Sequence, residues 1–93
     1  MLFFVQCVDK ANATQLRQQT RPAHLEYLKP FTGQILLAGP TLADDQATPT
    51  GSVFVLDLPD RASAERFCAD DPYAKVGLFE RTTIQPFRKV IPA

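Results

Sequence analysis

The sequence of 93 residues predicts an α+β fold in which two helices cover one face of a four-stranded antiparallel sheet. Apolar runs typical of strands alternate with two helical segments in the order strand, helix, strand, strand, helix, strand. A polar loop at 43–50 separates the second and third strands and favours their antiparallel pairing. Because no linker-like or repeated segment interrupts the chain, we expect residues 1–93 to form a single domain.

The first third of the chain predicts one strand and one long helix. Residues 2–8 are strongly apolar and indicate a strand. Residues 12–31 have a helical pattern, with Asn12 as the expected N-cap. Pro22 is expected to kink or restart this helix, because its ring removes a backbone donor. Gly33 suits the C-terminal end of the helix.

The middle of the chain predicts two strands and a second helix. Residues 34–40 and 52–58 are rich in Ile, Leu, Val and Phe, which is typical of strands. Residues 60–69 are predicted to be helical, since Ala64 and Phe67 lie one turn apart on an apolar stripe.

A short turn and a last strand complete the expected fold. The Asp71-Pro72 pair opens a turn, because Asp is a favoured N-cap and Pro a favoured first helical residue. Residues 79–90 indicate a strand, which Pro86 should confine to an edge or a bulge. This order of elements is the split βαβ arrangement of ferredoxin-like folds.

The strand sequences also predict a partner for the sheet. Two helices can cover only one of its faces, yet residues 2–8, 34–40 and 52–58 are apolar at odd and even positions alike. A sheet with one solvated face would alternate apolar and polar residues. We therefore expect a homodimer in which the second face packs on another copy of the same sheet.

Composition narrows the classes of partner. Lys and Arg together equal Asp and Glu, so the formal charge is zero and no nucleic-acid partner is expected. Met1–Val5 lacks the flanks of a signal peptide, and no apolar run approaches the roughly 20 residues that span a bilayer. We expect no membrane partner and a cytoplasmic location. Cys7 and Cys68 lack C-x-x-C spacing and are expected to be free, buried thiols.

His24 is the only histidine and the first candidate for chemistry, because imidazole exchanges protons near neutral pH. It lies four residues before Leu28 and shares the helical face that looks toward the sheet. Spacing alone leaves two readings open: a structural histidine bonded to a backbone carbonyl, or an acid/base group. A single histidine and scattered carboxylates provide no metal site, and no phosphate-binding loop is present, so we expect no metal and no cofactor.

The other candidates also carry two readings each. Asp71 either caps the Asp-Pro turn or also orients His24, because a carboxylate has about four lone-pair sites. Arg21 either binds a substrate anion or pairs with a surface carboxylate such as Glu26. The hydroxyl of Ser52 either contacts a ligand at a pocket mouth or belongs to turn chemistry.

Five short motifs, in order along nearly the whole chain, resemble the YciI-like, or YCII-related, family of dimeric α+β-barrel proteins. They are Arg21-Pro22-Ala23-His24-Leu25, Ala38-Gly39-Pro40, Gly51-Ser52, Asp71-Pro72-Tyr73 and Pro86-Phe87. The resemblance implies a homodimer with a cleft in each subunit and an active-site pair that matches His24 and Asp71. Proteins that share this barrel include a dehydrochlorinase of chlorinated aromatic breakdown, lactone isomerases and cofactor-free monooxygenases.

Sequence and resemblance together favour a small cofactor-independent lyase or isomerase that moves a proton on a small organic substrate. In this hypothesis His24 is the general acid/base and Asp71 orients it. The expected substrate contacts are Arg21, Ser52, Tyr73 and Phe79. The alternative is a non-catalytic homodimeric module that binds a small ligand or a partner protein, with His24 and Asp71 as structural hydrogen-bonding groups.

Overall fold

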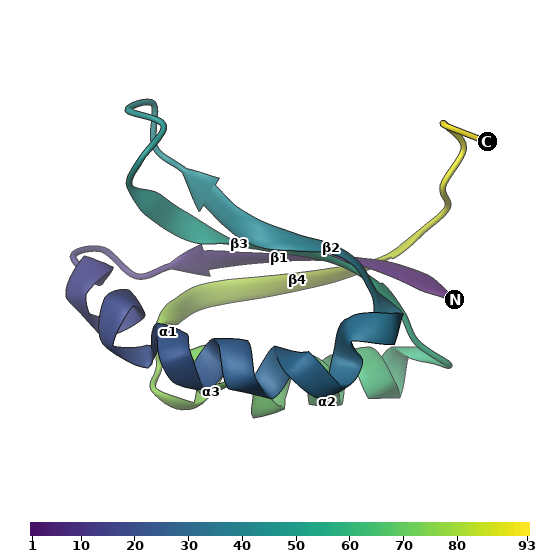
Figure 1. The fold of residues 1–93 in the computed structure, drawn as a ribbon, viewed down its shortest axis with the longest axis horizontal. Coiled ribbons are helices and arrows are strands. Elements are labelled where there is room, and N and C mark those ends of the chain that lie inside the picture. The colour runs from purple at the N-terminus through teal and green to yellow at the C-terminus, as the bar shows by residue number, and fades with distance from the viewer.

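The computed structural model describes residues 1–93 as a sheet with all of its helices on one face (Figure 1). On the opposite face, the hairpin tip around 43–48 and the C-terminal segment 88–93 project away from the sheet (Figure 1). The elements in chain order are β1 (Leu2–Asp9), α1 (Thr14–Leu28), the 3₁₀ helix η1 (Lys29–Gln34), β2 (Ile35–Leu42), β3 (Pro49–Asp57), α2 (Arg61–Asp70), α3 (Pro72–Lys75) and β4 (Phe79–Phe87).

The sheet has the strand order β2-β3-β1-β4, and every neighbouring pair is antiparallel. This arrangement confirms the predicted ferredoxin-like α+β fold. β4 lies at an edge, where Pro86 stands opposite Phe3 of β1, as expected for a residue that cannot donate to a ladder. The strand ends at Phe87, three residues before the predicted end at Val90.

The first helix differs from the prediction at both ends. It begins at Thr14, and Asn12 does not cap it, because the Asn12 backbone takes a left-handed conformation with φ of 59°. The chain stays α-helical on both sides of Pro22, so the helix does not restart there. The helix then tightens into η1, where Gly33 lies in the 3₁₀ turn without a positive φ.

The second helix and the following turn form as their capping residues predict. The Asp60 carboxylate accepts a hydrogen bond from the backbone N–H of Ser63 at 2.8 Å, which fixes the start of α2. Asp71 caps α3 in the same way, and Pro72 occupies the first helical position. The Asp-Pro prediction is confirmed, and the carboxylate of Asp71 is thereby held in one orientation.

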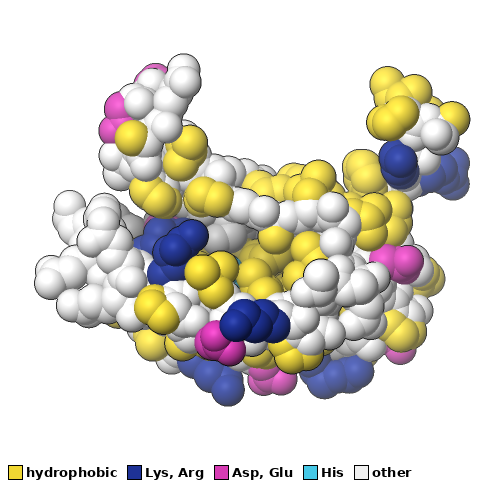
Figure 2. All heavy atoms as spheres, viewed as in Figure 1, with side chains coloured by type: hydrophobic (Ala, Val, Ile, Leu, Met, Phe, Trp, Pro, Cys, Tyr) yellow, Lys and Arg dark blue, Asp and Glu magenta, His cyan; other side chains and the backbone are white.

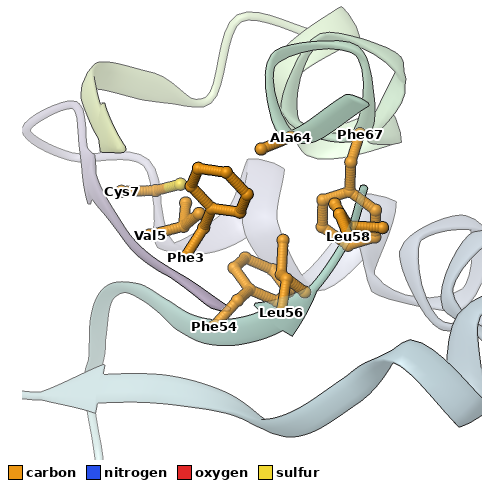
Figure 3. Packing of buried hydrophobic residues seen from close by; sticks show 8 residues of the cluster. All are labelled: Phe3, Val5, Cys7, Phe54, Leu56, Leu58, Ala64 and Phe67. Atoms are coloured by element: carbon orange, nitrogen blue, oxygen red, sulfur yellow. The ribbon is translucent and has the colours of Figure 1, made fainter. Parts of the chain in front are cut away.

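The hydrophobic core lies between the sheet and α2 (Figure 3). Its buried members are Phe3, Val5, Cys7, Phe54, Leu56, Leu58, Ala64 and Phe67. The Phe67 ring contacts the Phe54 ring edge-on, with centroids 5.5 Å apart. Both thiols are free; burial raises the pKa of Cys7 to about 11 and that of Cys68 to about 12.

The outer face of the sheet, which carries no helix, is apolar across its centre. Leu37 pairs with Val55, which also pairs with Phe4, so the three side chains form one row across β2, β3 and β1. Leu37 is 54% exposed and the adjacent Leu36 49% exposed. Hydrophobic side chains gather between the two projecting segments (Figure 2). None of the helices combines the length and apolar composition needed to cross a membrane.

Candidate active site

A cavity of about 250 Å³ lies between α1 and the strands β2 and β3. Half of its lining residues come from α1, and the other half come from the two strands and from one residue of α3. The lining residues are Thr14, Arg17, Gln18, Arg21, His24, Leu25, Leu28, Ala38, Gly39, Pro40, Pro49, Ser52, Phe54 and Tyr73.

α1 presents its functional side chains in one stripe. Arg17, Arg21, His24 and Leu28 follow one another at intervals of three or four residues, which places them on the same helical face. That face looks toward the sheet, as the sequence predicts. The stripe therefore places two guanidinium groups and one imidazole along the same wall of the cavity.

His24 and Asp71 form a buried pair although 47 residues separate them in the chain. His24 Nδ1 lies 2.8 Å from Asp71 Oδ1, and the two residues are 7% and 2% exposed. An ionised carboxylate can only accept hydrogen bonds, so Nδ1 carries the proton and donates it. The same Oδ1 atom accepts the backbone N–H of Tyr73 at 2.9 Å. Asp71 is thus both the cap of α3 and the partner of His24.

The second nitrogen of His24 faces the cavity. Nε2 has no hydrogen-bond partner within the chain, while no buried side-chain nitrogen or oxygen lacks one, so Nε2 is accessible. The imidazole stacks on the Tyr73 ring with centroids 4.0 Å apart and an interplanar angle of 19°. The Phe54 ring contacts it edge-on at 6.2 Å. These contacts fix the ring while its lone pair stays open to a ligand.

Arg17 is a central residue of the site that the sequence analysis did not single out. Its Nε and Nη2 atoms donate to Asp9 at 2.7 and 3.1 Å, and Nη2 also donates to Ser52 Oγ at 2.8 Å. Its Cζ atom lies 4.6 Å from the centre of the Tyr73 ring. Burial opposes the charge, but the bonds to Asp9 prevail and raise the pKa of Arg17 above its ordinary value.

The predicted substrate contacts reach the cavity with one exception. Arg21, Ser52 and Tyr73 line it, and Glu26 pairs with Lys29 at 2.7 Å instead of with Arg21. Phe79 does not line the cavity, contrary to expectation. It packs edge-on against the Tyr73 ring, with centroids 5.9 Å apart, and joins the hydrophobic core. The side of β4 on which it lies is set by strand pairing, which its neighbourhood in sequence does not reveal.

One signal in the sequence could have identified Arg17. It stands one helical turn before Arg21 and two turns before His24, on the stripe already assigned to the sheet side. Asp9 gives a weaker signal, as an acidic residue at the end of an apolar strand. No group of three or more His, Cys, Asp and Glu side chains lies close enough to hold a metal ion.

The YCII-related domain family matches residues 1–88. The chain belongs to this family. Protein YciI of Escherichia coli is 34% identical to it, over 97% of this chain and 99% of its own length. An uncharacterized protein of Haemophilus influenzae is 30% identical over the same shares. The resemblance stated from the sequence motifs is therefore confirmed.

One solved structure that resembles this YCII-related domain is that of an enzyme. The structure of 5-chloro-2-hydroxyhydroquinone dehydrochlorinase, TftG, from Burkholderia phenoliruptrix in complex with 2,5-dihydroxybenzoquinone superposes with a TM-score of 0.88. It is 32% identical to this chain, covering 95% of this chain and 94% of that one. An antibiotic biosynthesis monooxygenase shares the fold alone, with a TM-score of 0.58 and 18% identity.

Proposed function

We propose that this YCII-related protein is a small cofactor-independent enzyme, a lyase or an isomerase, that moves a proton on a small organic substrate. The observation that supports the proposal is the buried His24–Asp71 pair at the cavity wall, with His24 Nε2 accessible. A base that is oriented by a carboxylate and faces a cavity is an arrangement suited to general acid/base catalysis.

The proposed step is a proton transfer at a carbon next to a carbonyl group. His24 Nε2 takes the proton, the electron pair of the broken C–H bond forms the C=C bond of an enolate, and the carbonyl electron pair moves onto oxygen. The imidazolium then returns the proton to another atom, which isomerises the substrate, or a leaving group departs with its bonding pair. Asp71 stabilises the imidazolium through Nδ1–H.

The similarity to TftG supports an oxygenated ring as the first substrate class to test. That protein is described as a dehydrochlorinase of a chlorinated hydroxyhydroquinone, and its structure holds a dihydroxybenzoquinone. Such rings carry the carbonyl and enol groups that the proposed proton transfer needs. We therefore propose hydroxylated quinols and quinones as candidate substrates of this protein. They would bind in the cavity of about 250 Å³.

Turnover by a His24 variant tests the proposed role directly. Chlorinated and unchlorinated hydroxyquinols are incubated with the protein in deuterium oxide, and NMR follows deuterium uptake at carbon while an electrode follows chloride release. The His24→Ala variant is expected to lose about 10²- to 10⁴-fold in rate. Arg66→Ala, an exposed position on α2, serves as the control with the wild-type rate. A His24→Ala protein as active as the wild type would refute the role of His24.

The tautomer of His24 tests whether Asp71 orients the base. Nitrogen-15 NMR of the single histidine is expected to report the neutral Nδ1–H form in the wild type and a mixture of tautomers in Asp71→Ala. Asp70→Ala is the matched control, since Asp70 is exposed beside Asp71. A wild-type spectrum dominated by the Nε2–H form contradicts the oriented base and favours the binding module. The same holds if the Asp71→Ala spectrum is identical to that of the wild type.

We also propose that the protein acts as a homodimer through the outer face of the sheet. Leu37 supports this assembly, because it is 54% exposed at the end of the apolar row that it forms with the buried Val55 and with Phe4, and exposed apolar surface of this kind is typical of interfaces. Light scattering should give a mass that rises with concentration toward that of a dimer. Leu37→Glu should weaken association at least about tenfold, whereas Val76→Glu, a control of similar exposure, should not. A constant monomer mass would rule out the dimer.

A further inference from the structure

We infer that the cavity is an anion site in which Arg17, Arg21 and the Tyr73 hydroxyl bind an ionised oxygen of the substrate. The substrate class is then a small planar oxyanion, such as an enolate, a phenolate or an ionised hydroxyquinone. The inference deepens the proposed function, on which it rests for the assignment of the reacting atom to the side of His24.

The charge of the cavity wall is positive. Two of its lining residues are arginines and none is Asp or Glu. Asp9 balances Arg17 through two hydrogen bonds, but Asp9 itself does not line the cavity. Arg21 is absent from all five ion pairs of the chain. The charge of the Arg21 guanidinium at the cavity is therefore not neutralised by any carboxylate of the chain, and a bound anion would neutralise it.

Arg17 still has a free donor on the cavity side. Its Nε and Nη2 atoms are occupied by Asp9 and Ser52, which leaves Nη1 outside those three bonds. Arg17 also forms a side-chain hydrogen bond with Tyr73, and both residues line the cavity. The bonds to Asp9 and Ser52 hold the guanidinium plane in place, so the remaining N–H donor is preorganised to share an incoming oxygen with the Tyr73 hydroxyl.

Tyr73 adds a neutral donor between the charges. It forms a side-chain hydrogen bond with Arg17, and because a guanidinium can only donate, the hydroxyl accepts that bond and keeps its own proton for a ligand in the cavity that Tyr73 lines. Burial raises the pKa of Tyr73, although the charges of Arg17 and Arg21 oppose the shift, so the phenol stays protonated. A protonated phenol donates a hydrogen bond to an anion, whereas a phenolate would repel it.

The anion donors and the base are organised around one ring. The Tyr73 ring stacks with His24 at 4.0 Å and contacts the Arg17 guanidinium at 4.6 Å. A small planar molecule can therefore place a carbon at His24 Nε2 and an oxygen at the guanidinium groups at the same time. The negative charge that collects on this oxygen during proton transfer is then stabilised by fixed donors.

Equilibrium binding of two quinones tests the anion site without any turnover. The probes are 2,5-dihydroxybenzoquinone, whose enolic hydroxyls are ionised at neutral pH, and its neutral dimethyl ether, both measured by calorimetry. The wild type should prefer the ionised quinone at least about tenfold, and added salt should weaken that binding. Arg21→Gln should lose about tenfold in affinity for it, since a charged hydrogen bond is removed.

A second variant and a control keep the test decisive. Arg17→Lys retains the charge but loses the fork of donors, and it should also lose about tenfold in affinity while its thermal melting shows a folded protein. Arg66→Gln, outside the cavity, should bind like the wild type. The anion site is overturned if the wild type does not bind the ionised quinone saturably. It is equally overturned if both quinones bind equally well, or if Arg21→Gln binds like the wild type.

The His24→Gln variant separates this inference from the proposed function. It should keep the affinity for the ionised quinone, because its guanidinium groups are intact, while losing turnover. Normal turnover in His24→Gln with impaired binding in Arg21→Gln would reject the acid/base role and leave the anion site standing. Lost turnover in His24→Gln with unimpaired binding in Arg21→Gln would reject the anion site and leave the acid/base role of His24 standing.

Discussion

The two ends of the helical layer pack against the same sheet in opposite ways. Beneath α2 the sheet meets Ala64 and Phe67, the two buried side chains of that helix, and both are apolar (Figure 3). Beneath α1 it meets Arg17, Thr20 and His24, each buried and each hydrogen-bonded. Apolar packing is non-directional, whereas a hydrogen-bonded network holds each side chain in one orientation. The polar end is therefore suited to a reactive site, and the apolar end to stability.

The polar end folds only because its groups are satisfied as a set. A buried polar atom left without a partner costs about 1–3 kcal/mol, and an unpaired charge costs more. In this chain no buried side-chain nitrogen or oxygen is left without one. Asp71 satisfies both His24 and the start of α3, and Ser52 satisfies a third donor of Arg17 beyond the two that bond Asp9. Removing one of these side chains leaves another polar group buried without a hydrogen-bond partner. At the apolar end, removing a side chain leaves no such group.

The largest expected effect comes from breaking the Arg17–Asp9 pair. Arg17→Met leaves Asp9 buried without its cation and should lower the free energy of unfolding by about 3–5 kcal/mol. Adding Asp9→Leu should recover most of this loss, because an apolar pair replaces the ionic one. Urea denaturation gives the free energy of unfolding of the wild type, of Arg17→Met and of the double variant. If the double variant is less stable than Arg17→Met, the cost does not come from the stranded carboxylate.

A change of shape at the apolar end should cost less. Phe67→Leu removes ring contacts with Phe54 and Phe31 but strands no polar group, so we expect a loss of about 1–2 kcal/mol. The same urea experiment measures it, with the exposed Arg66→Leu on the same helix as control. A loss equal to that of Arg17→Met would remove the distinction drawn between the two ends.

The contrast between the two ends also explains which features of the fold could be predicted from the sequence. The order of elements along the chain, the helix at 60–69 and the Asp-Pro turn follow from periodicity and capping, which are local properties. The failed prediction at Asn12 has a local cause too, because asparagine serves both caps and left-handed turns. At the helix end after Leu28, the tightening into a 3₁₀ turn follows from no pattern in the sequence that we recognise.

The site was less predictable because its contacts join distant parts of the chain. His24 and Asp71 were paired through the family resemblance, since spacing could not tell whether side chains 47 residues apart meet. Arg17 was missed because arginines on helices are ordinarily exposed. Its burial depends on Asp9 and Ser52, which two different strands bring to it.

The smallest expected effect concerns the thiols of the apolar end at alkaline pH. Burial raises the pKa of Cys7 to about 11 and of Cys68 to about 12, above the unfolded value of 9.0. Unfolded thiols therefore lose their protons first, so this contribution to stability is complete below pH 9 and disappears as the pH rises through these values. Arg17 stays charged over that range, because its bonds to Asp9 raise its pKa above its ordinary value.

Urea midpoints measured across this range should thus fall more in the wild type than in the Cys7→Ala/Cys68→Ala variant, which has no thiols to ionise. Part of the fall should persist in the variant, since burial also raises the pKa of Tyr27 to about 12. Equal slopes in the two proteins would contradict the burial of the thiols.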